Sequence, residues 1–574
     1  MALRIRYLTA TFFFIICILS TIDTHLFVYP SLSRSLLTEI GWIVFALCIL
    51  IHSIIKKMTI NICKQELFIT FFIGFIIVHG WLWGKESYRT MYLCTGLGGI
   101  LCVSQALKQE LLTKGDIQKG LLTILAINLC YIVLEALHII SSNNPYFIIT
   151  GANENPTVTA EYMATCIPLL IGTYHSSKHE KAIAVLLVLT IFCIFLLKCR
   201  TAYIGLGMAM ACLIGCNEKS KNWIKRAKGK YIIAGAFVLT LTATSSTLYH
   251  AKKDSADGRF LIWKLSAKMI VEKPWGVGYG MFEKSYNEKQ SLYFAKEQGT
   301  AQEQKNASFT AMAYNDYLEQ GIEGGIAGLL FLFAFYIIFI ATAKKKSLIT
   351  EFSIITSLAV MSLFNFVYAG VSLWIMIVCT TGIIIGTKDN SYIIHIKHHV
   401  VVLCIVLVSY WGYGIIQIIY AQAQLYKIRQ KMQAHVFVND SHYKSIEKAI
   451  GSSEAFWYQR ARTAIKNNEY QLACACLDKA HCYTSMPRIL LSLYEVKKRL
   501  EEEDQSIKHI IAYSNMCPHK LLPRAILMRY YNQRNETNKA IIYARSIVEI
   551  EQKVYNPKAI SFKREAMAFL NAHK

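Results

Sequence analysis

The chain has 574 residues, of which 54% are hydrophobic and 17% are charged, and its formal net charge is +24. At least a dozen apolar stretches of about 17–25 residues occur before residue 421, each long enough to cross a hydrocarbon core of about 30 Å as a helix. These stretches argue against a soluble protein. The basic residues of this region gather in alternate short loops, which argues against nucleic acid as the partner.

The apolar stretches predict an all-α fold, in which residues 1–420 form a polytopic transmembrane bundle of about 12–13 spans. The first stretch lacks a small-residue cleavage site and is expected to remain as a span. The expected spans are 8–28, 36–55, 66–83, 90–106, 119–140, 157–174, 181–197, 199–215, 230–249, 318–342, 349–368, 371–387 and 396–420.

The loops between these spans differ in charge. One alternate set holds 21 Lys and Arg residues, whereas the short loops of the other set hold five. Basic loops stay on the cytoplasmic side, so the N-terminus is expected there and the C-terminal region on the outer side of the membrane. A single miscounted span would reverse the side of the C-terminal region.

A long outer loop is expected at 250–317. Within it, residues 259–272 predict a helix with a broad apolar face that stops before Pro274. The helix is too short and too charged to span, so we expect it to lie on the membrane surface.

Hydropathy falls after residue 421, and helical patterning continues through a predicted second domain at 425–574. The segments 454–482, 488–516 and 521–550 each predict a helix pair. Their spacing is similar to that of tetratricopeptide-type repeats, although the usual signature positions are poorly kept. Such arrays present a concave surface to a protein or peptide partner. Four of the seventeen cysteines lie in this region and allow one disulfide, but no cysteine or histidine spacing indicates a metal site.

Three sequence patches carry the candidate chemistry. In the first, Arg200 opens an expected span after a short outer turn. The second runs from Asp257-Gly258-Arg259 through Trp263 to Pro274-Trp275-Gly276-Val277-Gly278-Tyr279-Gly280-Met281-Phe282. The third is Ala313-Tyr314-Asn315-Asp316-Tyr317-Leu318, continuing into Gly321-Ile322-Glu323-Gly324-Gly325.

In their order around one outer loop, these patches resemble the motifs of the O-antigen ligase/polymerase superfamily, over about residues 150–345. The resemblance implies a membrane enzyme that moves a glycan from an undecaprenyl-diphosphate carrier to an acceptor, with no cofactor and without a metal. It implies that Arg200 and Arg259 hold the diphosphate and that Asn315, Trp263 and Gly278 belong to the acceptor and loop region. Arginine suits phosphate oxygens because its planar fork stays charged. For Arg200, simple snorkelling to the interface is the alternative.

The sequence departs from the family at Tyr314, where the family has a histidine. An ordinary tyrosine has a pKa near 10, too high for a general base at neutral pH. We therefore expect Tyr314 to position the acceptor, with the proton passing to Asp316, Glu323, Glu319 or Glu161. Histidines on the outer side are further candidates, and a loss of activity is a further alternative.

The glycine-rich string 276–280 has no preceding strand and predicts a tight turn rather than a nucleotide loop. Residues 151–156 are similar to a family loop before a span, and are equally consistent with a substrate rim or a helix cap. The acceptor is a lipid A-core, another glycan chain, as in a polymerase, or a protein side chain, and the motifs do not separate these. Two other readings remain at this stage, a lipid-linked sugar transporter and a membrane-anchored scaffold.

Overall fold

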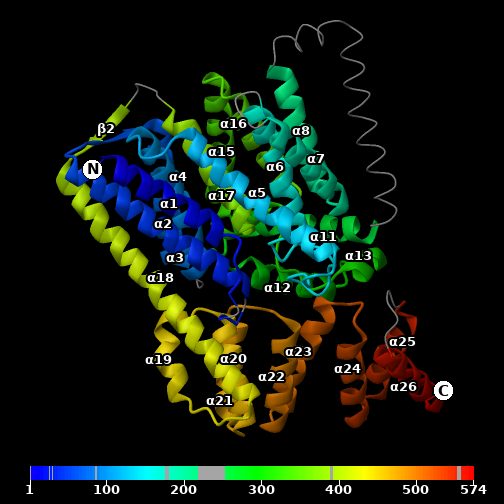
Figure 1. Cartoon of the computed structure of the whole chain (residues 1–574). Helices are drawn as coiled ribbons and strands as arrows, with labels where there is room; N and C mark the ends of the chain where they lie inside the picture. The colour runs from blue at the N-terminus through cyan, green and yellow to red at the C-terminus, as the bar shows by residue number, and fades with distance from the viewer. Residues whose placement is uncertain are drawn as a thin grey trace, which may run out of the picture.

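The computed structural model describes residues 2–24, 26–28, 30–83, 87–174, 180–216, 253–387, 392–551 and 557–573. Figure 1 shows a bundle of long helices above a row of short helix pairs, with the helices of the long loop between them. The predicted span 230–249 lies outside the described residues. The described chain is helical apart from turns and one pair of short strands, as the apolar patterning predicted.

The bundle is built from apolar helices because a helix pairs its own backbone groups where water is absent. Six of the described helices are long and apolar enough to cross a membrane, and several of the others are shorter. The bundle helices are α1 (Ala2–Leu19), α2 (Pro30–Ile55), α3 (Lys64–Trp83), α4 (Ser87–Lys108), α5 (Lys114–Ala136), α6 (Pro156–Tyr174), α7 (Glu180–Leu196), α8 (Arg200–Cys216), α15 (Gly325–Lys345), α16 (Ile349–Met361), α17 (Val371–Gly386) and α18 (His398–Gln433).

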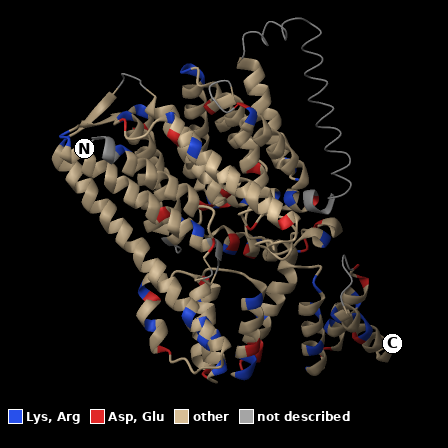
Figure 2. Ribbon diagram, viewed as in Figure 1, with Lys and Arg blue, Asp and Glu red and all other residues tan. Residues whose placement is uncertain are grey.

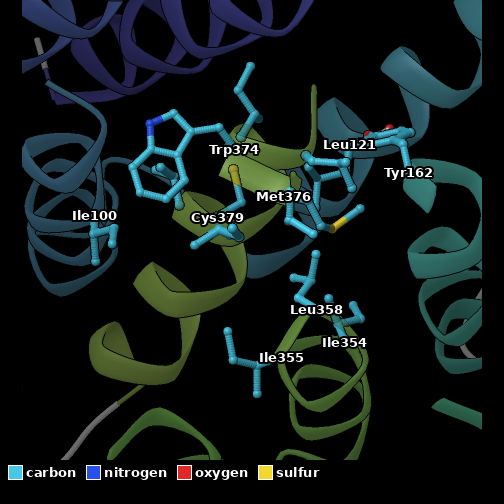
Figure 3. Close-up of a cluster of buried hydrophobic side chains, with 14 of the residues drawn as sticks. Ile100, Leu121, Tyr162, Ile354, Ile355, Leu358, Trp374, Met376 and Cys379 are labelled. Atoms are coloured by element: carbon cyan, nitrogen blue, oxygen red, sulfur yellow. Dashed lines mark hydrogen bonds between the residues drawn. The ribbon is translucent and has the colours of Figure 1, made fainter. Parts of the chain in front are cut away.

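Helix α17 lies at the centre of the bundle. Nearly all of its side chains are buried, and it packs against α4, α5, α6 and α16. Figure 3 shows Trp374, Met376 and Cys379 of this helix surrounded by apolar side chains of its neighbours, such as Ile100 and Leu358. A helix that is apolar on nearly all sides belongs in such a position, which explains its largely apolar sequence.

The loops predicted to share one side meet at one end of the bundle. Strands β1 (Ile60–Cys63) and β2 (Tyr392–Ile396) pair there as an antiparallel ladder. Lys108 at the end of α4 pairs with Glu66 at 2.5 Å, and Lys114 at the start of α5 pairs with Glu351 at 2.7 Å. Figure 2 shows basic residues at this end, away from the row of helix pairs. These contacts bring described residues of several basic loops together at one end of the bundle.

The first predicted span, 8–28, ends earlier than expected, at Leu19, and two other predicted spans are interrupted in the structure. The span expected at 318–342 is split at Gly324 and Gly325 into α14 (Asp316–Glu323) and α15. The span expected at 349–368 ends at Met361. Residues 362–370 follow as an irregular segment, whose only regular element is the short 3-10 helix η1 (Val367–Ala369). Irregular backbone at this depth requires partners within the protein, and the segment has them, as described below.

The long loop forms α11 (Lys253–Glu272), α12 (Phe282–Ala295), α13 (Ala301–Asn306) and α14. Helix α11 contains the surface helix expected at 259–272. Its Leu261 and Leu265 are buried, whereas Phe260 is 67% and Val271 is 80% exposed. The exposed apolar side chains suit a helix that lies against lipid.

The C-terminal region forms helix pairs in the three segments predicted for them. These are α20 (Glu454–Lys466) with α21 (Tyr470–His481), α22 (Pro487–Arg499) with α23 (Glu503–Met516), and α24 (Leu521–Gln533) with α25 (Thr537–Glu549), flanked by α19 (Ser441–Ile450) and α26 (Pro557–Ala572). All seventeen cysteines are free, so the disulfide considered for this region is not formed.

These helix pairs dock on the long loop through α12, which packs along α23. Gln290 of α12 donates to the carbonyl of Met516 at 2.7 Å, and Ser291 donates to that of Ala512 at 3.0 Å. Glu283 accepts hydrogen bonds from Thr484 and from the backbone of Ser485. The helix pairs and the loop therefore lie at the same end of the bundle (Figure 1).

Candidate active site

The second and third sequence patches are joined by backbone hydrogen bonds. Val277 donates to the carbonyl of Ile322 at 2.9 Å, and the backbone of Ile326 donates to that of Pro274 at 2.9 Å. Gly276 and Gly325 have φ angles of +83° and +67°. A Cβ on Gly276 would lie 2.4 Å from the carbonyl oxygen of Glu323, and one on Gly325 would lie 2.4 Å from that of Pro274. The glycines of both patches are thus needed for close approach, and the string 276–280 is the tight turn that was predicted.

The third patch also holds the segment 362–370. The backbone of Asp316 donates to the carbonyl of Ser362 at 2.8 Å, and its carboxylate accepts from the backbone of Val367 at 2.9 Å. The amide of Asn315 donates to the carbonyl of Leu363 at 2.9 Å while its oxygen caps α14. Three backbone groups of a non-helical segment are thereby satisfied within the protein.

A polar cavity of about 360 Å³ opens between these elements. Arg259 of α11, Tyr314 and Asn365 line it, together with Asn155 at the start of α6. The remaining lining residues are Phe147, Thr157, Gly258, Leu261, Ile262, Gln290, Asn306, Ala307, Ser308, Phe309, Thr310 and Phe366. The cavity brings together parts of the second and third patches and the loop before α6, and we define it as the Arg259 cavity.

Arg259 is held in place without a neutralising carboxylate. Its Nη1 donates to the carbonyl of Phe364 at 2.9 Å, and its guanidinium lies 4.9 Å from the ring centre of Tyr314. Among the residues that the structure describes, no carboxylate lies within salt-bridge distance of it. Burial lowers the pKa of Arg259 from its ordinary value, and the charge of Arg200 acts in the same direction. A half-buried arginine without a salt-bridge partner favours an anion in the cavity.

Arg200 lies at the first position of α8, directly after Cys199. Its charge is close enough to act on Arg259, so the two predicted arginines lie near each other. Arg200 is partly buried and does not line the Arg259 cavity itself. Because it opens a helix, the backbone N–H groups of the first turn of α8 add to the positive potential around it.

Tyr314 has a φ angle of +52°, a conformation that non-glycine residues seldom adopt. Its ring also meets Phe366 edge-on, with ring centres 5.7 Å apart. The indole of Trp263 donates to the carbonyl of Ala313 at 3.2 Å and so fixes the residue before it. Strained backbone held by its surroundings is common where a side chain must be positioned for function.

Glu161 of α6 is the carboxylate that reaches this site from the bundle. Its Oε1 accepts a hydrogen bond of 2.6 Å from Asn365, which lines the cavity, and its charge acts on Arg259. Asn155 both lines the cavity and accepts from the backbone of Thr157 at 2.9 Å. Asn155 therefore caps α6 and also lies at the wall of the cavity.

Other predicted site residues lie outside the cavity lining. Asp316 is buried against Ser362 and Val367, and Glu323 accepts from the backbone of Gly280 at 3.0 Å. Gly278 donates its backbone N–H to the carbonyl of Glu323 at 3.0 Å. The structure therefore brings Arg259, Tyr314 and Asn365 together and places Asp316, Glu323 and Gly278 behind them.

Sequence reasoning missed Asn365 and Arg89. Asn365 is the one side-chain amide in the stretch 349–368 that is expected to be a span, and that amide is the signal that could have marked it. Arg89 pairs with Glu319 at 3.2 Å and with Glu323 at 3.8 Å. In the sequence, Arg89 is one of the five basic residues of the less charged set of loops. Its partners lie more than 200 residues away, so no local pattern connects them.

No group of three or more His, Cys, Asp or Glu side chains that could hold a metal ion occurs in the described part of the chain. Residues 185–333 match a family model described as O-antigen ligase. No curated protein was found to match the chain. The matched segment contains all three sequence patches, so the resemblance first read from them is supported independently.

Proposed function

We propose that this chain, which carries the O-antigen ligase domain of a membrane glycosyltransferase family at residues 185–333, transfers a glycan from undecaprenyl diphosphate to an acceptor hydroxyl. A ligase that acts on a lipid A-core is our first choice. A polymerase or a protein oligosaccharyltransferase would use the same donor site. The observation that carries the proposal is the uncompensated charge of Arg259 in a polar cavity.

In the proposed reaction, the acceptor oxygen attacks the anomeric carbon and forms the new glycosidic bond. The bond from that carbon to the phosphate oxygen breaks, and undecaprenyl diphosphate leaves with the bonding electron pair. In this proposal, Arg259 and Arg200 stabilise the negative charge that develops on the leaving group. The acceptor proton must pass to a base. We assign this role to Glu161, which is hydrogen-bonded to Asn365 of the cavity lining.

The test is transfer by purified protein from extracted lipid-linked oligosaccharide. Arg259→Ala should lower kcat/KM by roughly 100-fold, since a charge-assisted hydrogen bond contributes about 1.5–3 kcal/mol. Arg259→Lys should lower it at least about 10-fold because the bidentate geometry is lost. Lys268→Ala, on the same helix but outside the cavity, is the control. Wild-type transfer by Arg259→Ala would exclude the proposed role.

We further propose that the chain lies in a bacterial inner membrane, with the N-terminus in the cytoplasm and the helix pairs in the periplasm. The support is the excess of basic residues in loops that share one end of the bundle, opposite the helix pairs. An alkaline phosphatase fused after residue 434 should be active and a β-galactosidase fused there inactive. The reverse result would place the helix pairs in the cytoplasm.

A further inference from the structure

A second cavity of about 340 Å³, lined by apolar, aromatic and polar side chains, lies on the other side of the segment 362–370. Asn365 and Phe366 line the Arg259 cavity, whereas Ala369 and the following Val371 line this one. Its other walls come from α2, α4, α18 and residues 449–454, so the C-terminal region completes it. We define it as the Arg89 cavity.

The Arg89 cavity presents groups that suit hydroxyl-rich ligands. Tyr88 and Tyr92 supply aromatic rings, and Ser35 and Gln422 supply hydrogen-bonding groups. Gln422 is 4% exposed, its side chain lines the cavity, and its amide makes no hydrogen bond to any residue that the structure describes. Such an amide can both donate to and accept from the hydroxyl groups of a ligand.

The charge of this cavity differs from that of the Arg259 cavity. Arg89 already pairs with Glu319 and Glu323, and Glu454 also lines the cavity. The charge of Arg89 is thus already balanced by carboxylates, and Glu454 adds a further carboxylate to the lining, which disfavours a phosphate group. A neutral saccharide fits this balance, whereas the diphosphate fits the Arg259 cavity.

The two cavities are connected through one side chain. Glu319 accepts from Arg89 with one carboxylate oxygen at 3.2 Å, and with the other it accepts from the backbone of Ala313 at 3.0 Å. Ala313 directly precedes Tyr314, whose ring meets Arg259. Glu319 and the backbone of Ala313 thus link Arg89 in this cavity to Tyr314 in the cavity proposed for the donor.

We propose that the Arg89 cavity binds the acceptor as a neutral saccharide, and that the C-terminal region contributes to acceptor selection through Gln422 and residues 449–454. This inference rests on the proposed function. It goes beyond the matched domain, which ends at residue 333, because the residues that close the cavity lie after that point.

The test begins with photo-crosslinking in native membranes. Benzoylphenylalanine in place of Ala449, which lines the cavity, should form an adduct that contains periodate-reactive carbohydrate. The same group in place of Ser445, an exposed residue one turn earlier on α19, is the control and should form none. An adduct at 449 that holds only protein or only lipid, or no adduct, would overturn the proposal.

The saccharide released from the adduct is then titrated as acceptor in the transfer assay. Ala449→Trp fills the cavity, and Gln422→Leu removes its unpartnered amide. Each should raise the KM for this saccharide at least 10-fold and leave the KM for the lipid-linked donor within twofold, with Ser445→Trp as the matched control. A change in donor KM with an unchanged acceptor KM would contradict the proposal.

This outcome is separable from the failure of the proposed function. If transfer proceeds normally in Arg259→Ala, the donor site is wrong whatever the crosslink shows. If Arg259→Ala is inactive but the saccharide KM is unchanged in Ala449→Trp and Gln422→Leu, only the acceptor cavity is wrong. Thermal unfolding of each variant checks that the bundle is intact.

Discussion

At Arg259, a backbone carbonyl, an aromatic ring and a second arginine meet around one guanidinium. The carbonyl and ring orient the group without cancelling its charge, as a salt bridge would. Such an arginine is available to an incoming anion and is already in position, which lowers the ordering cost of binding. The order of the sequence patches was enough to predict that Arg259 and Tyr314 belong together.

Tyr314 is the residue at which the chain departs from the family it resembles. Tyr314→Phe should keep about a tenth or more of the transfer activity, because the ring contact with Arg259 remains. Tyr314→Ala should lose substantially more, since both the ring and the hydroxyl are removed. Comparing kcat for the two variants is the measurement. Equal inactivity of both would identify the hydroxyl as the reacting group, and the rate of wild type should then rise toward alkaline pH.

Glu161 and Asp316, two of the candidate bases, differ in their contacts. Glu161→Gln should lower kcat severely while the protein keeps its unfolding temperature. Asp316→Asn should instead lower the unfolding temperature, because the Asp316 carboxylate holds the backbone of Val367. Transfer rates and unfolding curves of both variants, measured together, distinguish a loss of catalysis from a loss of stability. A stable, inactive Asp316→Asn would return Asp316 to the role of base that the sequence suggested.

At the scale of elements, the site depends on a joint between two turns. The glycines of α14–α15 and of the turn after α11 allow their backbones to touch, which fixes Tyr314 relative to Arg259. The sequence predicted the turn at 276–280, but it did not predict its partner. Hydrogen bonds between distant segments leave no periodic pattern in either one.

Gly325→Ala should destabilise the protein by about 1–3 kcal/mol or more, since its φ is positive and its Cβ would lie 2.4 Å from the carbonyl oxygen of Pro274. Gly74→Ala is the control. Gly74 is a helical glycine of α3 with open space around its Cβ position, so alanine should be neutral or stabilising there. Thermal unfolding followed by tryptophan fluorescence measures both, and an unchanged Gly325→Ala would show that the joint is dispensable.

Residues 362–370 show where sequence patterning has its limit. The stretch is apolar enough to continue the predicted span 349–368, and local hydropathy cannot reveal that α16 stops at Met361. It stops because Asn315, Asp316 and Arg259 compete for the backbone groups that the helix would use. Those residues lie far away in the chain, so the interruption and both cavities beside it depend on tertiary structure.

At the scale of the whole molecule, the contact of α12 with the helix pairs contains a buried acid. Burial raises the pKa of Glu283 to about 7, although Thr484 and the backbone of Ser485 favour its ionised form. Its folded-state pKa therefore exceeds that of the unfolded chain. The folded state binds more protons between about pH 4.5 and 7, so this group's contribution to stability decreases as the pH rises through that range.

Glu283→Gln should flatten this pH dependence and should be more stable than wild type at pH 8, by at most about 3 kcal/mol. The unfolding temperature of both proteins at pH 6 and pH 8 is the measurement. His481 and His509 lie near this contact with lowered pKa values, and their stabilising contribution is lost on acidification. Comparing the two proteins at each pH removes that common contribution. Identical pH profiles would show that Glu283 does not titrate in this range.

The docking of α12 on the helix pairs also orders the events of biosynthesis. Glu283 and its partner Thr484 are 201 residues apart in the chain. At about 5–20 residues per second, the ribosome needs roughly 10–40 s to supply the partner after α12 has been made. The nascent protein must therefore wait in the membrane with one side of its long loop uncovered. Docking of the helix pairs on the long loop therefore follows synthesis of the C-terminal region and cannot accompany insertion of the helices that precede it.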